Sequence, residues 1–249
     1  MDRIAIISDI HGNIPALEAV LDDISNKQVK KIICLGDLVG KGPCPDIAVD
    51  IIREKCETVI MGNWDEMVTR PNGSELMIWA RNKIGDIRAN YLRSLPFSID
   101  FFMSGKLVRL MHASPQGIHH RVHSGSPIEK LYGMFENTEL TGRSKSNRKP
   151  DIVGYGDIHG TYIMNFENLD NRVVFNVGSV GNSLDSTLAS YAIIEGIYEQ
   201  QQYSSFSINF VRVPYDVELA IHQAREANMP GLDPYTIELR TACYRGAAK

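Results

Sequence analysis

The sequence predicts an α/β protein in which two β-sheets pack face to face between helices. Up to about residue 160, short apolar runs typical of strands alternate with segments of helical spacing. After Gly160, four strand-like runs follow one another with polar turns between them. No linker rich in Gly, Pro or Ser divides the chain, and two sheets flanked by helices accommodate both halves. We therefore expect residues 1–249 to form a single domain, with a C-terminal helix and tail from about residue 215.

The strand-like runs of the first half each end in polar residues. They are RIAIISD, KKIICLGD, ETVIMGN, LVRLMHAS and DIVGYGD. Between the first and second strands, apolar residues from Leu17 to Ile24 recur at helical spacing. After the second strand, Pro45 opens the helical segment PDIAVDIIREK. Residues 74–94 and 127–140 complete the helices expected in this half.

The second half predicts a β-meander that ends in a helix. Its strands are YIMNF, RVVFNV, SYAIIEG and SFSINFVRV, and the helix is YDVELAIHQAREA. The segment GRSKSNRK at 142–149 is expected to be an exposed loop. Its basic residues offer a polyphosphate contact as the alternative to a solvated surface. They are Arg143, Lys145, Arg148 and Lys149.

The composition excludes several classes of protein. Of 249 residues, 43% are hydrophobic and 22% are charged, which is not the composition of a disordered or collagen-like chain. A net charge of −4 argues against a nucleic-acid partner, and therefore against a nuclease. No apolar run reaches the roughly 18 residues of a membrane span, and MDRIAIISD does not have the pattern of a secretory signal. Four cysteines without a CxxC spacing suit reduced thiols and a cytoplasmic location.

Polar side chains gather where the strands of the first half end. They are Asp9, His11, Asp37, Asn63, His112, Asp157 and His159. An Asp at one strand end is more often a helix cap, but five such fragments at successive strand ends indicate a shared site at one sheet edge. Zinc takes about four ligands, so seven suit a pair of ions about 3.5–4 Å apart with one bridging carboxylate. Nitrogen and oxygen donors without thiolate suit Mn²⁺, Fe, Co²⁺ or Zn²⁺.

The motifs DIHGN, GDLVGKGP, GNWD, MHASP and GDIHG occur in this order, followed by FNVGSVG and SYAIIEG. Over about residues 2–200 the chain resembles the calcineurin-like metallophosphoesterases, in particular the small bacterial phosphodiesterase-type branch. The resemblance implies a four-layer α/β/β/α sandwich of two mixed sheets flanked by helices, with a dinuclear metal centre. It assigns one metal to Asp9, His11, Asp37 and His159, and the other to Asn63, His112 and Asp157, with Asp37 bridging. A hydroxide between the metals would attack phosphorus in line.

The chain departs from the family pattern at three positions. Asp157 stands where a His ligand is expected, and Val177 where Pro is common. Trp64 replaces a His that in the family often contacts substrate or protonates the leaving group. The changes at 64 and 157 motivate an alternative function, a protein-binding scaffold that has lost catalysis.

The resemblance and the residues together predict a phosphoesterase that depends on two divalent metals. We expect it to cleave a phosphodiester or phosphoanhydride in a small phosphorylated substrate, with a nucleotide as one candidate, and to form a homodimer. Manganese is the first choice of metal, with iron, zinc, cobalt or nickel as alternatives. The catalytic candidates are Asp37, Asn63 and His112, and the substrate-binding candidates are Asn13, Trp64, His119 and His120. The histidines at 119, 120 and 123 are either a flap over the metals or an exposed polar loop.

Overall fold

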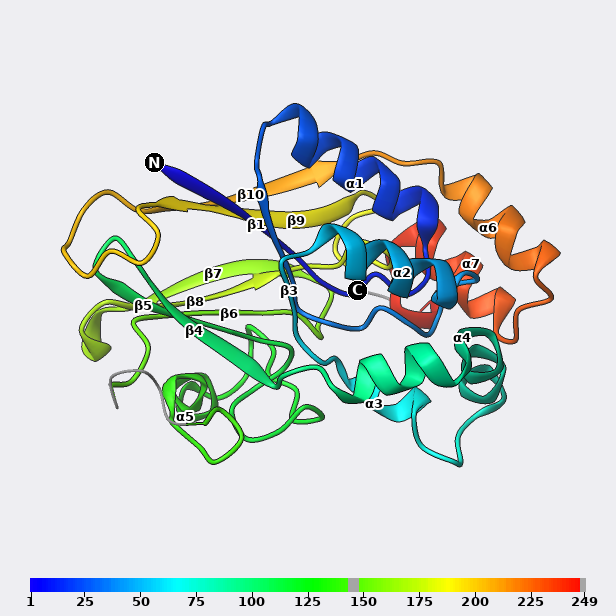
Figure 1. Ribbon diagram of the computed structural model, residues 1–249, viewed down its shortest axis with the longest axis horizontal. Helices are drawn as coiled ribbons and strands as arrows, with labels where there is room; N and C mark the ends of the chain where they lie inside the picture. The colour runs from blue at the N-terminus through cyan, green and yellow to red at the C-terminus, as the bar shows by residue number, and fades with distance from the viewer. Residues whose placement is uncertain (143–147, 247–249) are drawn as a thin grey trace.

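The protein consists of two five-stranded mixed sheets packed face to face, with helices on both outer sides (Figure 1). This computed structural model describes residues 1–142 and 148–246. Figure 1 shows α1 (Ile14–Asn26) above one sheet and α5 (Ile128–Tyr132) below the other. The predicted fold class, an α/β/β/α sandwich, is therefore confirmed.

The first sheet has the strand order β10-β9-β1-β2-β3. Its strands are β1 (Asp2–Ile7), β2 (Lys31–Cys34), β3 (Thr58–Val59), β9 (Ala189–Gly196) and β10 (Ser207–Val213). The three strands β1, β2 and β3 run parallel, whereas β9 is antiparallel to both β1 and β10. The parallel strands bring three carboxyl ends to the same edge of this sheet.

The second sheet has the order β4-β5-β6-β8-β7. Its strands are β4 (Ser98–Met103), β5 (Lys106–Met111), β6 (Ile152–Tyr155), β7 (Thr161–Phe166) and β8 (Arg172–Val177). Here β5, β6 and β8 run parallel. Strand β4 was not predicted, and its Phe101 lies in the core.

The predicted β-meander after Gly160 is wrong. Although β7 and β8 form a hairpin, β8 also pairs in parallel with β6, and β9 joins the other sheet beside β1. Seven of the eight residues of β9 are buried, because this strand lies between the helical layer and the second sheet. A strand buried on both faces needs cover from both sides, which a two-layer meander does not supply.

The predicted helices are present, but α3 (Asn63–Val68) and α7 (Leu232–Thr241) were not predicted and one helix is shorter than expected. The segment from Pro45 to Lys55 forms α2 as expected, and the remaining helices are α4 (Glu75–Arg93) and α6 (Val217–Glu226). The helix expected over 127–140 is shorter, because α5 and a 3₁₀ turn end at Phe135 and Glu136 is extended. Two further 3₁₀ turns cover Glu167–Leu169 and Tyr244–Gly246.

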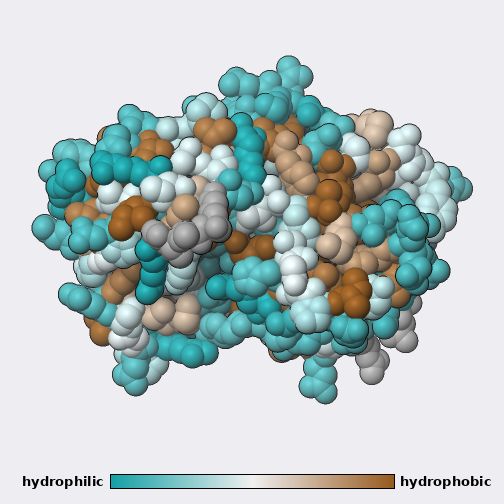
Figure 2. All heavy atoms as spheres, turned by 180° about the vertical axis from the view of Figure 1, so that it is seen from behind, coloured by the Kyte–Doolittle hydropathy of each residue, from teal (hydrophilic) through white to brown (hydrophobic). Residues whose placement is uncertain are grey.

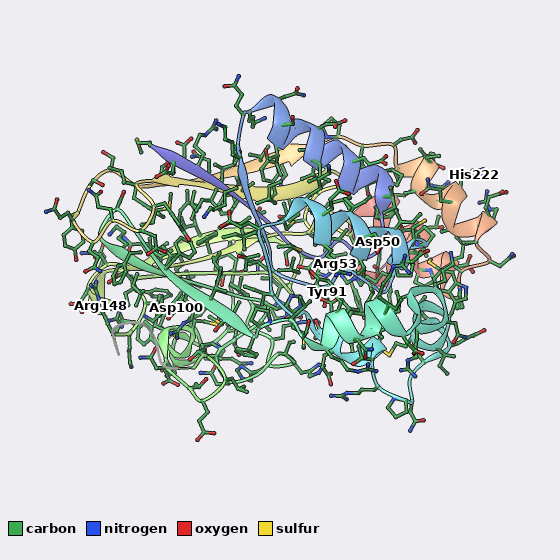
Figure 3. All side chains as sticks on the ribbon, viewed as in Figure 1. Asp50, Arg53, Tyr91, Asp100, Arg148 and His222 are labelled. Atoms are coloured by element: carbon green, nitrogen blue, oxygen red, sulfur yellow. The ribbon has the colours of Figure 1, made fainter. Side chains whose placement is uncertain are left out.

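Apolar clusters hold the layers together. Ile6 and Ile194 of the first sheet pack against Leu110 and Phe175 of the second. On the outer side of the first sheet, α1, α2 and α4 contribute a larger cluster. Figure 3 shows Asp50, Arg53 and Tyr91 together where α2 meets α4, and there Arg53 lies over the Tyr91 ring. Burial of these faces supplies the main favourable free energy of the fold.

The surface carries both hydrophobic and hydrophilic side chains. On the face shown in Figure 2, hydrophobic side chains lie in several groups separated by hydrophilic ones. Among the residues that the structure describes, no helix is long and apolar enough to cross a bilayer.

Candidate metal centre

Side chains that follow five parallel strands of the two sheets converge at one site. Asp9, Asp37 and Asn63 follow β1, β2 and β3 of the first sheet. His112 follows β5 of the second sheet, and the segment 157–159 follows β6. The site was predicted at one sheet edge, but it lies between the edges of two sheets.

Five of these seven side chains belong to residues with left-handed backbone. The φ angles are 55° for Asp9, 50° for His11, 54° for Asp37, 66° for Asp157 and 60° for His159. A non-glycine residue in such a conformation costs on the order of 1–3 kcal/mol and persists only where its surroundings determine it. Five such residues in one cluster indicate that the rest of the fold holds these side chains so that they face one another.

Asp9, His11 and His159 form the first group of metal-ligand atoms. The Nε2 atoms of the two histidines are 3.2 Å apart, and Oδ1 of Asp9 lies 3.2 Å from Nε2 of His159 and 3.7 Å from that of His11. All three side chains are buried. In the described part of the chain, Oδ1 of Asp9 has no hydrogen bond of acceptable geometry. A buried carboxylate oxygen facing two ring nitrogens fits a cation between them.

Asp9, Asp37 and His112 form a second group, which shares Asp9 with the first. Its Oδ1 is 3.5 Å from Nε2 of His112, and its Oδ2 is 3.8 Å from Nε2 of His11. Oδ1 of Asn63 lies 2.9 Å from Nε2 of His112. The structure therefore brings together six of the predicted ligands, with Asp37 beside both histidines as a bridging carboxylate would be.

Backbone carbonyls hold the three histidines in one orientation. Nδ1 of His11 lies 3.0 Å from the carbonyl of Val39, that of His112 2.8 Å from Leu35, and that of His159 2.5 Å from Asn182. Because a carbonyl only accepts, each Nδ1 must carry a proton, so a metal could bind only through Nε2, which faces the cluster. Histidine ligands of metals in proteins are oriented in this way.

The charges of the cluster shift the pKa values of its members. Burial alone would lower the pKa of His112, but Asp37 and Asp9 outweigh it and raise the pKa to about 10. Burial would raise the pKa of Asp9, yet His159 and His11 hold it well below its usual value. A protonated His112 thus stabilises the carboxylates in the way that a metal would.

Asp65 is a supporting residue that the sequence analysis did not assign. Its Oδ2 accepts hydrogen bonds from the N–H of Asp37 and of Gly62, at 2.8 and 3.0 Å, and its Oδ1 accepts one from Leu38 at 2.9 Å. It therefore ties the Asp37 turn to the start of α3. The residue lies within the GNWD motif, but a local pattern does not reveal a partner 28 positions away.

Glycines give the ligands room at two positions. A Cβ at Gly62 would lie 2.1 Å from Oδ1 of Asp37, and one at Gly156 would lie 2.7 Å from Oδ2 of Asp9. Both contacts are impossible for a side chain, so only glycine fits here.

Asp157 differs from the other predicted ligands because it forms a bidentate ion pair. Its Oδ1 accepts a hydrogen bond from Nη2 of Arg121 at 2.7 Å, and its Oδ2 accepts one from Nε at 2.9 Å. It belongs to neither group of metal-ligand atoms. Arg121 has no motif signal, and its role appears only in three dimensions.

A cavity of about 540 Å³ lies over the cluster and reaches Asn63, Asp157 and His159. Further residues lining it include Lys41, Trp64, Met67, Arg121, His123 and Tyr244. A smaller cavity of about 260 Å³ shares Lys41, Trp64 and Tyr244 with it and continues toward α7. The indole of Trp64 packs over Gly40, and its ring centroid is 6.0 Å from that of His11.

The other substrate-binding candidates lie outside this cavity. Asn13 is buried at the start of α1, where its side chain caps the helix and donates to the carbonyl of Gly181. His119 pairs with Glu66, and His120 with Ser114. From this segment it is Arg121 and His123 that line the cavity. Arg148 pairs with Asp151 on the surface, and Arg143 and Lys145 lie outside the described residues.

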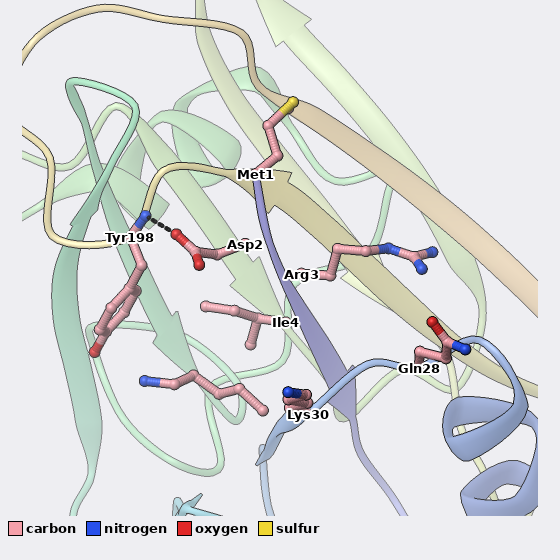
Figure 4. A pocket seen from close by; sticks show the side chains of 8 residues that line it. Met1, Asp2, Arg3, Ile4, Gln28, Lys30 and Tyr198 are labelled. Carbon is pink, nitrogen blue, oxygen red and sulfur yellow. Dashed lines mark hydrogen bonds between the residues drawn. The ribbon is translucent and has the colours of Figure 1, made fainter.

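Another cavity, of about 350 Å³, lies at the opposite end of the first sheet (Figure 4). It is lined by the amino ends of β1 and β2, including Arg3, and by Tyr198, whose N–H donates to Asp2. Two of its basic side chains are already paired, Arg3 with Glu195 and Lys31 with Glu57. It does not adjoin the candidate metal centre.

The chain is similar to a known protein family and to known structures. A family model for the "Calcineurin-like phosphoesterase superfamily domain" matches residues 2–196. The chain belongs to the calcineurin-like phosphoesterase superfamily. Its members are in general metal-dependent hydrolases, which agrees with the two groups of ligand atoms in this structure.

Similar proteins cover nearly the whole of this calcineurin-like phosphoesterase. The uncharacterized protein MJ0912 of Methanocaldococcus jannaschii is 32% identical over 238 residues, which are 91% of this chain and 93% of that protein. A metallophosphoesterase from Sphaerobacter thermophilus has a TM-score of 0.76 at 26% identity and covers 96% of this chain and 99% of its own. The hypothetical protein PH1004 of Pyrococcus horikoshii OT3 shares the fold, with a TM-score of 0.76, 16% identity and full coverage of both chains.

Proposed function

We propose that this protein hydrolyses a phosphodiester or phosphoanhydride with the help of two divalent metal ions. The observation that carries the proposal is the buried cluster in which Nε2 atoms and carboxylate oxygens face one another beneath an open cavity. Asp9, His11, Asp37 and His159 would hold one ion, and Asp37, Asn63 and His112 the other. Two such ions activate water and neutralise charge on the phosphoryl oxygens. The nitrogen and oxygen donors favour manganese, with iron, zinc, cobalt or nickel as alternatives.

The protein's own residues orient the reaction. The backbone carbonyls of Val39, Leu35 and Asn182 fix the histidine rings, and Asp65 fixes the turn that carries Asp37. Asp37 also accepts a hydrogen bond from the N–H of Trp64 at 2.7 Å. Because these groups are already fixed, they lower the reorganisation energy of the site when charge develops at phosphorus.

The cavity suggests the character of the leaving group. Trp64 and Tyr244 present aromatic rings, and Lys41 places a cation beside them. A planar ring that stacks on an aromatic side chain gains about 1–3 kcal/mol, so an aryl or nucleoside leaving group fits this wall. A nucleotide is the natural substrate class that combines such a ring with a phosphoanhydride or phosphodiester. The cytoplasmic location and the homodimer remain predictions.

The test is metal content together with turnover. Mn²⁺-loaded protein should hold about two ions per chain, as in other two-metal sites, and should cleave bis(p-nitrophenyl) phosphate. Asp37→Asn should lower the rate by more than about 100-fold, since supporting residues of metal ligands alone contribute about 10–100-fold. The exposed Asp86→Asn on α4 is the matched control and should keep full activity. Full activity of Asp37→Asn would overturn the assignment, and a protein without metal or turnover would be the scaffold instead.

A further inference from the structure

The ion pair between Arg121 and Asp157 faces the cavity above the metal-ligand cluster. The Asp157 side chain is 3% exposed and that of Arg121 is 51% exposed, so the guanidinium covers the carboxylate and reaches solvent itself. Both residues line the cavity. Nη1 of Arg121 has no hydrogen-bond partner among the residues that the structure describes.

Asp157 is bound differently from the two central carboxylates. Oxygen atoms of Asp9 and Asp37 face histidine nitrogens at 3.2 to 3.8 Å, and neither residue pairs with Lys or Arg in the described part of the chain. Both oxygens of Asp157 accept from a guanidinium in the fork geometry that is among the strongest charge-assisted pairs. A metal at Asp157 would have to compete with this arginine.

We propose that Asp157 is a positioning residue for Arg121 and not a metal ligand, and that Arg121 binds the phosphoryl oxygens of the substrate. This rests on the proposed function above and names the group that receives the anion. The guanidinium lines the cavity and keeps the N–H donors of Nη1 unpaired among the described residues, while Asp157 holds its plane. Arginine held in this way suits a phosphate, whose oxygens accept two parallel hydrogen bonds.

The pairing of Asp157 decides where the positive charge of the site lies. With Asp157 as a ligand, two divalent ions, three aspartates and a hydroxide sum to about zero, and the remaining positive unit lies on Arg121. With Asp157 paired to Arg121, the metal centre itself is about one unit more positive, while the sum over the centre and Arg121 is unchanged. Lys41 also lines the cavity, but it is paired with Glu238 at 3.2 Å. In the GDIHG motif, Asp157 thereby replaces a metal ligand of the family by a residue that holds an anion-binding arginine.

The test uses Mn²⁺-loaded full-length protein, with metal analysis and calorimetric titration of inorganic phosphate as readouts. Arg121→Ala and Asp157→Asn should both keep the metal content of the unmodified protein. Arg121→Ala should weaken phosphate binding about 10- to 100-fold, the value of a charged hydrogen bond of about 1.5–3 kcal/mol. Asp157→Asn should weaken it less, because Arg121 remains but is no longer held. Arg240→Ala is the matched control, because Arg240 forms the same bidentate pair with Glu218 on the surface.

Loss of about one metal equivalent in Asp157→Asn would show that Asp157 is a ligand and would overturn the proposal. Phosphate affinity of Arg121→Ala within twofold of that of the unmodified protein, or no phosphate binding by the unmodified protein, would also overturn it. Arg121-dependent phosphate binding without turnover of any phosphoester supports the role of Arg121 and contradicts only the proposed function. Circular dichroism and thermal unfolding of each variant verify that it is folded.

Discussion

His112 faces Asn63 and Asp37 with a ring nitrogen that is protonated at neutral pH. Its raised pKa means that a proton occupies the position where a metal needs a lone pair. The same carboxylates that would hold a cation hold this proton. Proton and metal must therefore compete for one set of residues.

We expect metal affinity to rise with pH. The pKa of His112 is raised to about 10, so the group is protonated throughout the range from pH 6.5 to 8.5 and each bound ion displaces its proton. Mn²⁺ affinity should then increase up to about tenfold per pH unit. Calorimetric titration at several pH values measures this slope. His112→Asn should flatten it, whereas His222→Asn, on the outward face of α6 (Figure 3), should leave it unchanged. A flat slope in the unmodified protein would contradict the competition.

Trp64 stands where the family often carries a histidine, and indole supplies no proton to a leaving group. His123 also lines the cavity, but burial and the neighbouring Arg121 lower its pKa, so little of it is protonated at neutral pH. A positioned acid contributes about 10²–10⁴ in rate. Without a positioned acid, substrates whose leaving groups depart as stable anions react faster than the others.

The expected result is a steep dependence of kcat/KM on the pKa of the leaving group. Aryl phosphates and phosphoanhydrides should react much faster than alkyl phosphates, and Trp64→His should flatten the dependence. A series of substituted phenyl and alkyl phosphodiesters measures it. If the dependence is already shallow, His123→Ala should steepen it while His119→Ala, outside the cavity, should not. A shallow dependence that survives both changes would mean that Trp64 does not select the leaving group.

At the scale of elements, α4 changes direction at Gly85, and its two halves pack against different helices. Its first half places Leu76 and Trp79 against α6 and α7, and its second half packs Ala89 and Leu92 beneath α2. The break lies at Gly85, with φ 67° and ψ 178°, a conformation that only glycine adopts readily.

Replacing Gly85 by alanine should destabilise the protein by about 1–3 kcal/mol, the cost of this backbone conformation for a residue with a Cβ. No atom lies within 4 Å of the added methyl, so the loss would come from the backbone and not from a clash. Urea unfolding measures the change. Gly125→Ala is the control, because it is equally open and its φ lies outside the left-handed region. Equal stability of the two variants would show that α4 tolerates a straight path.

At the scale of the whole molecule, the site depends on the packing of one sheet against the other. Asp9, Asp37 and Asn63 belong to the first sheet, and His112 and His159 to the second. The core between them includes Ile6, Leu110 and Phe175. A metal that joins both sets of ligands binds only the folded chain and stabilises it by mass action.

Metal loading should therefore raise the free energy of unfolding. At a free metal concentration about 100 times the Kd, each site contributes about 2.7 kcal/mol, which for a chain of this size is on the order of 5–10 °C in Tm. Thermal unfolding with Mn²⁺ and with EDTA measures the shift. Asp37→Asn should lose most of it, whereas Asp86→Asn should keep it. An unchanged Tm in the unmodified protein would contradict binding between the sheets.

Much of the fold and the candidate site could be predicted from the sequence alone, since both rest on local patterns. Pro45 and the helical period that follows it mark α2 because capping and amphipathicity act within a few residues. The six side chains that the structure brings together were predicted because each directly follows an apolar strand.

The tertiary structure alone decided what depends on distant partners. Strand β9 does not belong to the predicted meander, because both of its faces are buried, one by the helices and the other by the second sheet. Strand β8 pairs with β6, which is distant in the sequence. Asp157 meets Arg121 from a loop 36 residues away, and Tyr244 reaches the cavity from the C-terminal segment. Local patterns record which residues are apolar or charged, but the choice among partners far along the chain is made by packing and charge in three dimensions.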